Sequence, residues 1–248
     1  MSGFTTGVGF LTRVPLRGAH ADLARAAPWF PVVGAVIGLA VGGAYAGLGH
    51  LVPAVVAAAV AILFGVLVTG VFHEDGLADV ADAFAGGWTQ EDRLRILKDP
   101  RHGSYGVAAL SGSIVLRIVT LATFGPASGF AACVCAHALG RSAAVGTMAL
   151  TAPTTRSGLG SQVFSDARRP ALAIGALAGL ALAAVATGWW SLPAALAAGV
   201  GAAVMVWLAA RKIGGVNGDV LGAIEQIGEC VTLVVLSGLA ARHPIWWR

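Results

Sequence analysis

Two long runs of this chain contain no Asp, Glu, Lys or Arg, and they limit the fold more than any other feature. The first extends from Ala26 to His73 and the second from Pro170 to Ala210. A helix that crosses the hydrocarbon core of a bilayer needs about 20 apolar residues, so each run is long enough for two crossings. Over the whole chain 57% of the residues are hydrophobic and only 11% are charged, too few to cover a soluble core. The sequence therefore predicts an integral membrane protein with a single domain over residues 1–248.

Breaks in the apolar pattern divide the chain into six or seven membrane-spanning helices. Clusters such as Gly125 and Pro126 separate neighbouring spans. The last span is the weakest, because Glu225 and Glu229 occupy its first turns. The short apolar segment Phe4–Leu16 is expected to lie at the membrane interface or to re-enter the bilayer. We therefore predict an all-α polytopic transmembrane helical bundle with about seven spans. They cover residues 28–48, 51–72, 105–124, 130–150, 171–189, 192–210 and 223–241.

Basic residues gather in the connections on one side of the predicted bundle. The loops near His50, Pro126 and Trp190 carry none, whereas the opposite connections carry twelve. Because loops rich in Lys and Arg stay in the cytoplasm, we expect the N-terminus and all polar loops on the cytoplasmic side of the inner membrane. No basic patch interleaved with aromatic residues indicates nucleic-acid binding. The twelve residues are Arg13, Arg17, Arg25, Arg93, Arg95, Lys98, Arg101, Arg156, Arg168, Arg169, Arg211 and Lys212.

Acidic residues concentrate between His73 and Gly106, a segment that holds 7 of the 12 in the chain. Asp75, Asp79 and Asp82 follow i, i+4, i+7 spacing, which places three carboxylates on one helix face. Clustered carboxylates repel one another unless a cation joins them, and all-oxygen ligands suit Mg²⁺ or Mn²⁺. The spacing favours a divalent metal site that holds a diphosphate, with a solvated acidic helix start as the alternative. His73 is open as a base, as a partner of a metal ligand or as a donor to phosphate.

A basic segment containing glycine follows the acidic one. Thr89–Leu97 indicates an ordinary surface helix capped by Thr89. Beyond it, Lys98 and Arg101 bring positive charge near the acidic face, and Ser104 lies between two glycines where a helix is expected to begin. Backbone N–H groups at a helix start, together with nearby cations, form an anion site. The segment therefore predicts a phosphate site. Its alternative is a loop whose basic residues only satisfy the cytoplasmic charge bias.

Two arginines, Arg117 and Arg141, lie inside predicted spans, where a charge is costly and usually faces a polar interior or a partner. Glu225 and Glu229 lie one helical turn apart and are candidate ion-pair partners for them. Glu229 is also open as a metal ligand or general base, and Arg141 is the better candidate for contact with phosphate. Asp219 follows a glycine-rich loop, where it either caps the last helix or joins the two glutamates in a second acidic group.

Three polar motifs resemble those of the cobalamin synthase family, the adenosylcobinamide-GDP ribazoletransferases. In chain order they are HEDGLADVAD at His73–Asp82, KDPRHGSYG at Lys98–Gly106 and GGVNGDVLGAIEQIGE at Gly214–Glu229. The stretches FLTRVP at Phe10–Pro15 and FPVVGAVIG at Phe30–Gly38 also resemble that family. The resemblance covers nearly the whole chain.

This resemblance implies a reaction and a metal. Adenosylcobinamide-GDP is joined to α-ribazole, or to its 5′-phosphate, with release of GMP, a late step of cobalamin biosynthesis. Family members require Mg²⁺, and their acidic metal-binding motif maps onto Asp75, Asp79 and Asp82. The family usually has glycine where this chain has Ala83, and an aliphatic residue where it has His102, so His102 is given no catalytic role.

Together, these patterns predict one cavity that faces the cytoplasm. Asp75 and Asp79 are expected to hold the metal on the diphosphate, and Asp82 to share that metal or to act as the base. The number of ions, the lower-ligand base and the oligomeric state, homo-oligomers included, stay open. The further candidates are His73 and Asp79 in catalysis, Glu229 as a metal ligand, and Lys98, Arg101, Ser104, Arg141, Asp219 and Glu225 in substrate binding.

Two other classes of protein share parts of this pattern. A CDP-alcohol phosphotransferase also places an Asp-rich motif on a membrane helix, but here Asp79 stands where that motif has arginine. A transporter would use Arg117, Arg141 and Glu225 inside the bundle, with broken helices or inverted repeats near the midplane. Because the polar residues of this chain crowd one side instead, the pattern favours the enzyme.

Overall fold

The protein is a bundle of long helices, seen in a computed structural model that describes residues 2–16, 22–152 and 167–243. Every regular element in those ranges is a helix, which confirms the all-α prediction. In chain order they are α1 (Gly3–Leu11), α2 (Leu23–Ala26), η1 (Ala27–Trp29), α3 (Phe30–Leu48), α4 (Ala54–Thr69), α5 (Phe72–Gly86), α6 (Gln90–Ile96), α7 (Ser104–Leu121), α8 (Pro126–Leu150), α10 (Arg169–Thr187), η2 (Gly188–Trp190), α11 (Ser191–Ile213) and α12 (Gly218–Ala240).

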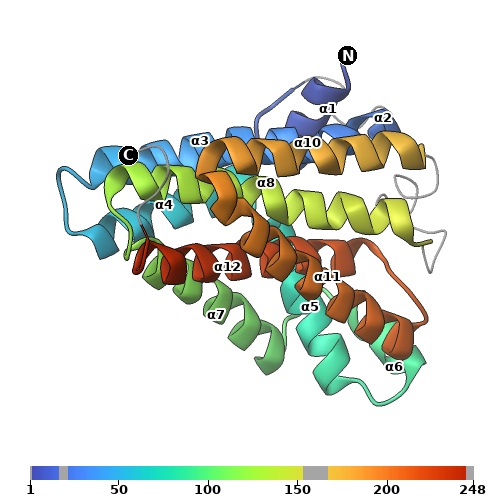
Figure 1. Cartoon of the computed structure of the whole chain (residues 1–248). Coiled ribbons are helices and arrows are strands. Elements are labelled where there is room, and N and C mark those ends of the chain that lie inside the picture. The colour runs from blue at the N-terminus through green and yellow to red at the C-terminus, as the bar shows by residue number, and fades with distance from the viewer. Residues whose placement is uncertain (1, 17–21, 153–166, 244–248) are drawn as a thin grey trace.

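Each apolar segment predicted to span the membrane coincides with a helix. In the described residues, 5 continuous helical stretches are long and apolar enough to cross a bilayer, or 6 if α4 and α5 count as one broken span. One stretch, Arg169–Ile213, contains two predicted spans, α10 and α11. Figure 1 shows the chain reversing direction between them, at Gly188, which has a φ of 57° that favours glycine. The fold is thus a polytopic membrane bundle.

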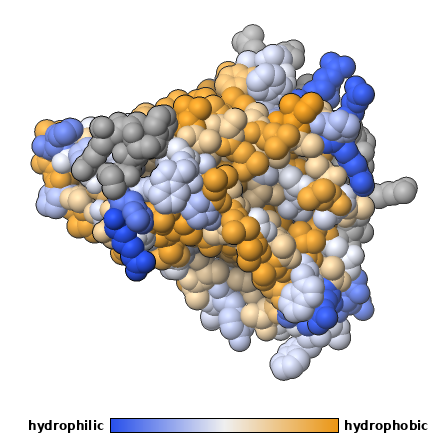
Figure 2. All heavy atoms as spheres, viewed as in Figure 1, coloured by the Kyte–Doolittle hydropathy of each residue, from blue (hydrophilic) through white to orange (hydrophobic). Residues whose placement is uncertain are grey.

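Polar elements gather at one end of this bundle. Figure 1 shows α8 and α11 ending, and α3, α10 and α12 beginning, at the end where α5 and α6 lie. The connections around residues 49–53, 122–125 and 188–190 lie at the opposite end. Two of the twelve basic residues used to predict this one-sidedness, Arg17 and Arg156, lie outside the described residues. Hydrophobic side chains cover most of the visible surface, and the most hydrophilic ones lie at its margins (Figure 2).

Helix α8 is the centre of the bundle, because small residues let its neighbours approach it closely. A Cβ added at Gly38 of α3 would lie 2.7 Å from the carbonyl oxygen of Cys133, and one at Gly42 would lie 2.7 Å from that of Phe130. Helices α10 and α12 also pack on α8. Such close approach through glycine is the usual way in which membrane helices associate. As a result, α8 carries His137 and Arg141 into the interior.

The chain bends by 89° between α4 and α5. Gly70 has a φ of 67° and Val71 a φ of 64°, which is strained for a β-branched residue. Arg13 supports the bend, because its backbone N–H donates to the Val68 carbonyl at 2.8 Å and its side chain donates to that of Gly70 at 3.4 Å. The bend turns the HEDGLADVAD segment across the polar end of the bundle. There Gly76 lies against α12, where an added Cβ would approach the Asp219 carbonyl to 2.9 Å.

Candidate functional site

Side chains from α5, from the start of α12 and from the loop before α7 form an exposed acidic group at the polar end of the bundle. Asp75 and Asp79 lie one turn apart on α5, and His102, in the loop before α7, lies between their side chains. Its Nε2 is 3.3 Å from Asp75 Oδ1 and its Nδ1 is 3.5 Å from Asp79 Oδ1. Asp219, in the first turn of α12, is close enough to act electrostatically on both carboxylates. We call Asp75, Asp79, His102 and Asp219 the acidic cluster.

The acidic cluster has the charge balance of a cation site. Helix α5 lies outside the five candidate spans. Partial burial, and then repulsion from Asp75 and Asp219, raises the pKa of Asp79 to about 6, although His102 opposes the shift. Ligand atoms of Asp75, Asp79 and His102 lie within 4.8 Å of one another. Carboxylate oxygens suit Mg²⁺ and imidazole suits transition metals, so the two aspartates fit a Mg²⁺ ion and His102 fits as their neighbour at ion-pair distance.

Asp82 faces a different partner from Asp75 and Asp79. It is 8% exposed, and its Oδ2 accepts from the Gly103 N–H at 2.6 Å while its Oδ1 accepts from the Gly106 N–H at 2.9 Å. The carboxylate therefore caps the start of α7, where the helix dipole favours a negative charge. The backbone N–H groups at the start of α7, predicted to bind an anion, therefore bind the carboxylate of Asp82. The structure thus places Asp82 as the link between α5 and α7, outside the group of ligand atoms formed by Asp75, Asp79 and His102.

The predicted phosphate residues before α7 are open to solvent. Lys98, Arg101 and Ser104 are all exposed. Arg101 is paired with Asp99, its Nη2 lying 2.8 Å from Asp99 Oδ2, whereas Lys98 forms no ion pair within the described residues. Thr89 caps α6, as predicted, by accepting from the Asp92 N–H at 3.1 Å. Positive charge available to an anion near the acidic cluster is therefore carried mainly by Lys98.

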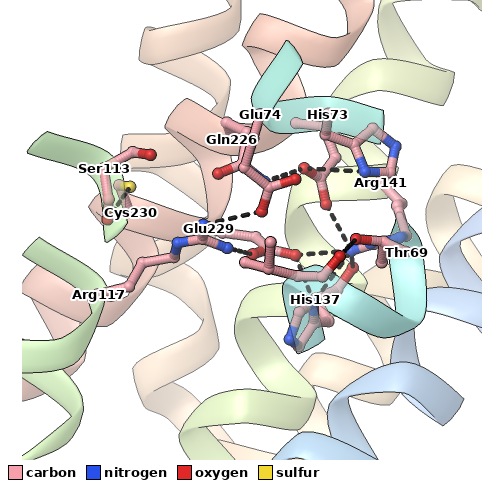
Figure 3. Close-up of polar contacts among 12 residues, drawn as sticks. Thr69, His73, Glu74, Ser113, Arg117, His137, Arg141, Gln226, Glu229 and Cys230 are labelled. Atoms are coloured by element: carbon pink, nitrogen blue, oxygen red, sulfur yellow. Dashed lines mark hydrogen bonds and ion pairs between the residues drawn. The ribbon is translucent and has the colours of Figure 1, made fainter. Parts of the chain in front are cut away.

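A second, buried group of charges lies deeper in the bundle (Figure 3). Arg117 of α7 donates to Glu74 Oε1 at 2.9 Å and to Glu229 Oε2 at 3.0 Å. Arg141 of α8 donates to Glu229 Oε1 at 2.7 Å and lies 2.5 Å from Glu225 Oε1. The pairing of both arginines with the glutamates of α12 is as the sequence predicted. We call Glu74, Arg117, His137, Arg141, Glu225 and Glu229 the buried ion network.

The buried ion network already contains its own cations. Ligand atoms of His137, Glu225 and Glu229 are near enough to hold a metal ion. However, Nη1 of Arg141 lies among them, 3.2 Å from His137 Nδ1 and within 2.7 Å of both carboxylates. A guanidinium therefore takes the place that a metal would need, and Glu229 joins α7, α8 and α12 instead. Arg141, only 2% exposed, is likewise bound within the network and does not reach the solvent-exposed acidic cluster.

Sequence reasoning missed two members of this network, and of its two alternatives for Asp219 the helix cap is not the one observed. Glu74 was treated only as part of an acidic run, and His137 was not considered, although it lies one turn before Arg141 inside an apolar helix. The cap of α12 is Asn217, whose Oδ1 accepts from the Val220 N–H at 3.0 Å, and not Asp219. Asn217 also donates to Asp219 Oδ2 at 3.0 Å, which turns that carboxylate toward the acidic cluster.

A pocket of about 70 Å³ adjoins the buried ion network. His73, Arg141 and Glu225 line its inner end, and the predicted catalytic residue His73 is therefore 6% exposed and faces this pocket. His73 Nδ1 lies 3.5 Å from Glu225 Oε2. The apolar walls are Phe10, Leu11, Phe30, Phe72, Ala144, Val145, Met148, Leu221 and the backbone of Gly218 and Gly222.

Comparison with known proteins gives one consistent result. The family model described as cobalamin-5-phosphate synthase matches residues 3–237. A protein of Chlorobaculum tepidum is 39% identical, over 99% of this chain and 98% of the relative. Proteins of Ralstonia pickettii (38%, covering 95% and 94%) and Shewanella baltica (35%, covering 94% and 92%) are similar to the same extent. All three carry the name adenosylcobinamide-GDP ribazoletransferase, and no solved structure matches the chain significantly.

Proposed function

The chain belongs to the cobalamin-5-phosphate synthase family, and we propose that it joins adenosylcobinamide-GDP to α-ribazole or its 5′-phosphate with release of GMP. A ribose hydroxyl attacks the phosphorus on the cobinamide side of the diphosphate. The new P–O bond forms as the bond to GMP breaks, and the hydroxyl proton passes to a base. The product is adenosylcobalamin or its phosphate. Little covalent chemistry is required of the protein, whose part is to orient the two substrates and to stabilise charge.

The observation that carries this proposal is the acidic cluster at the polar end, which His102 joins from the same loop as the exposed Lys98. We propose that Asp75 and Asp79 bind Mg²⁺, which when bound neutralises the diphosphate and the leaving GMP. Asp219 completes the acidic wall. Lys98, with Arg101 and the Ser104 hydroxyl, contacts phosphate from the other side.

The proton of the attacking hydroxyl needs an acceptor that is deprotonated near neutral pH. The pKa of about 6 for Asp79 applies without a metal ion, and a bound Mg²⁺ would lower it, so Asp79 serves as a ligand when the ion is present. Asp82 does not fit the role of acceptor, because both of its oxygens hold N–H groups of α7. We assign Asp79 as a Mg²⁺ ligand and Asp82 as a positioning residue that keeps Lys98–Ser104 beside α5, and we propose that solvent at the exposed cluster takes up the proton.

The membrane orientation is part of the same proposal. The polar end, with the N-terminus, faces the cytoplasm of a cell whose inner membrane the chain crosses repeatedly, as the basic residues at that end support. A cysteine introduced at Ser104 should react with a membrane-impermeant maleimide only in inside-out vesicles. Cys133, Cys135 and Cys230 are buried, so the background is low. Labelling in right-side-out vesicles would show that the polar end faces the opposite side of the membrane.

The reaction itself is tested with the full-length protein in lipid nanodiscs. Adenosylcobinamide-GDP, α-ribazole and Mg²⁺ should give equal amounts of GMP and adenosylcobalamin, measured by chromatography. Omission of α-ribazole should abolish GMP release, and chelation of the metal should do the same. Well-folded protein that forms no cobalamin, or that releases GMP equally without α-ribazole, would overturn the proposed function.

A further inference from the structure

The pocket beside the buried ion network is a shaft with an apolar wall and a polar floor. Along α12 its lining passes from Gly218, which is exposed, through Leu221 to Glu225, which is fully buried. Along α8 it passes from Met148 through Ala144 to Arg141. Both sets follow helical spacing, so each helix contributes one continuous face. The pocket therefore reaches the surface at Gly218, next to Asp219 of the acidic cluster, and also beside Phe72, which is 45% exposed.

Aromatic rings form one side of this shaft. Phe10 of α1 stacks on Phe30 of α3, with centroids 5.5 Å apart and planes at 9°. Phe72 meets Phe10 edge to face at 5.2 Å, and His73 meets Phe72 at 5.0 Å. Flat aromatic surfaces at this spacing favour another planar ring as ligand, since ring–ring contacts are geometrically selective.

The floor has hydrogen-bonding groups that the protein itself leaves unused. His73 Nδ1, Arg141 Nε and Glu225 Oε1 are buried and have no hydrogen-bond partner in the described residues. Arg141 Nη1 lies 2.5 Å from Glu225 Oε1, but not in hydrogen-bonding geometry. Buried polar atoms are almost always satisfied, so three together at the end of one pocket point to a ligand that completes them.

The two substrates of the proposed function differ in the edge that they would present to this floor. The base of α-ribazole is a benzimidazole whose ribose is on the nitrogen-containing ring, so its outer edge is hydrocarbon and cannot satisfy a carboxylate. Guanine carries its ribose on the imidazole ring, and its outer edge offers N1–H and amino donors with the O6 acceptor. That edge matches an unused carboxylate oxygen and an unused guanidinium N–H.

We propose that this pocket binds the guanine base of adenosylcobinamide-GDP, an inference that rests on the proposed function. N1–H and the amino group donate to Glu225 Oε1, because Oε2 already accepts from Gln226 Nε2 at 3.0 Å, and O6 accepts from Arg141 or His73. The volume of about 70 Å³ is less than the roughly 150 Å³ of a cavity that holds benzene, so the shaft encloses only the outer edge of the base. The ribose then leaves the mouth at Gly218, and the diphosphate reaches the acidic cluster.

Direct binding of the product nucleotide tests this assignment without turnover. Purified full-length protein in nanodiscs is titrated with GMP and with IMP, which lacks only the 2-amino group, by isothermal calorimetry. GMP should bind at least about tenfold more tightly, because IMP leaves the buried carboxylate partly unpaired. Glu225→Gln should bring the two affinities together. Equal binding of GMP and IMP to the wild-type protein would overturn the proposal.

A matched pair of variants on α8 tests the pocket independently of its charges. Ala144 lines the shaft, whereas the neighbouring Ala143, equally half-buried, does not. Ala144→Leu should weaken GMP binding by about 10–100-fold, since the added methyl groups take the space of the ring. Ala143→Leu should stay within about twofold of wild type, as should the KM for α-ribazole in both variants. If Glu225→Gln does not fold, the two alanine variants and the comparison of GMP with IMP on the wild-type protein are sufficient to test the proposal.

The remaining outcomes separate this inference from the proposed function. If Ala144→Leu raises the KM for α-ribazole and leaves GMP binding unchanged, the shaft belongs to the other substrate and the guanine assignment fails. If both alanine variants bind GMP like the wild type, the assignment also fails, while cobalamin formation by the wild type still supports the proposed function. If the wild type forms no cobalamin but prefers GMP as described, the proposed function fails and the guanine pocket stands.

Discussion

Glu74 and Asp75 are neighbours on α5, yet they belong to two groups of charges that differ in burial and in the source of their countercharge. Glu74 is 1% exposed and is held by Arg117, whereas the side chain of Asp75 is 60% exposed and lies beside His102. The buried ion network has three glutamates and two fixed guanidiniums, so the protein supplies most of the countercharge. The acidic cluster contains no arginine or lysine. A carboxylate in the first group joins helices, and one in the second is available to a cation from solution.

The largest effect should come from the buried side of this comparison. Glu229→Gln removes the carboxylate that Arg117 and Arg141 share, and breaking a buried ion pair costs about 3–5 kcal/mol. Thermal unfolding in detergent should therefore occur at a much lower temperature, with or without Mg²⁺. Glu91→Gln, which removes an exposed carboxylate on α6, is the control. A Glu229→Gln protein of normal stability that had lost only Mg²⁺ binding would make Glu229 a metal ligand after all.

A substitution in the exposed acidic cluster should lower the activity of the protein and leave its free energy of unfolding nearly unchanged. Asp75→Asn removes one charge from the proposed Mg²⁺ site, and we expect kcat to fall by about 100-fold, equivalent to about 2.7 kcal/mol. The free energy of unfolding should change by less than about 0.5 kcal/mol, as for most surface substitutions. GMP release and thermal unfolding are measured on the same preparation. Loss of stability comparable with that of Glu229→Gln would remove the distinction between the two groups.

Asp82 belongs to neither group, since it is buried but bound only to backbone N–H groups of α7, and it should show an intermediate effect. In Asp82→Asn one side-chain atom becomes a donor that faces an N–H group of α7, which costs about 1–3 kcal/mol. The first turn of α7 should exchange its amide hydrogens faster, and GMP release should fall because Lys98–Ser104 is displaced. Hydrogen exchange read by mass spectrometry separates this from a chemical role. Lost activity with unchanged exchange in α7 would return Asp82 to the list of bases and metal ligands.

The smallest effect is a shift of the pH profile. Asp79 is protonated below its pKa of about 6, so its metal-binding, basic form is lost as the pH falls through that value. At low Mg²⁺, GMP release should therefore decline on the acid side with a midpoint near this pH. Because Mg²⁺ competes with the proton, saturating Mg²⁺ should move the midpoint lower, by up to about one pH unit. A midpoint independent of Mg²⁺ would mean that Asp79 is not a ligand.

Local spacing was sufficient to identify parts of both groups. The i, i+4 relation placed Asp75 and Asp79 on one helix face, and the cost of a charge in an apolar helix marked Arg117 and Arg141. The same spacing could not show that Asp82 binds α7, because that contact depends on where another helix begins. His102 was set aside because the resembled family usually has an aliphatic residue there; its place beside Asp75 and Asp79 depends on the fold around its loop.

The helices themselves were more predictable than their breaks. Hydrophobic length gave the positions of α3, α7, α8 and α12, which follow from the bilayer alone. The sharp turn after α4 was not predicted, because a valine at positive φ contradicts local preference and is maintained by contacts with a distant residue, Arg13. At this turn, which brings the acidic motif to the polar end, tertiary contacts outweigh the local backbone preference of valine.

The short length of α4 has a consequence for the lipid around it. Its 16 residues rise about 24 Å, less than the roughly 30 Å of an average hydrocarbon core. The chain therefore turns into α5 before a helix of average crossing length is complete, and we expect the bilayer to thin beside α4, at a modest cost per ångström. Turnover should accordingly be faster in vesicles of shorter-chain phosphatidylcholine than in thicker ones. The thickness of the surrounding bilayer would then control the rate of the enzyme.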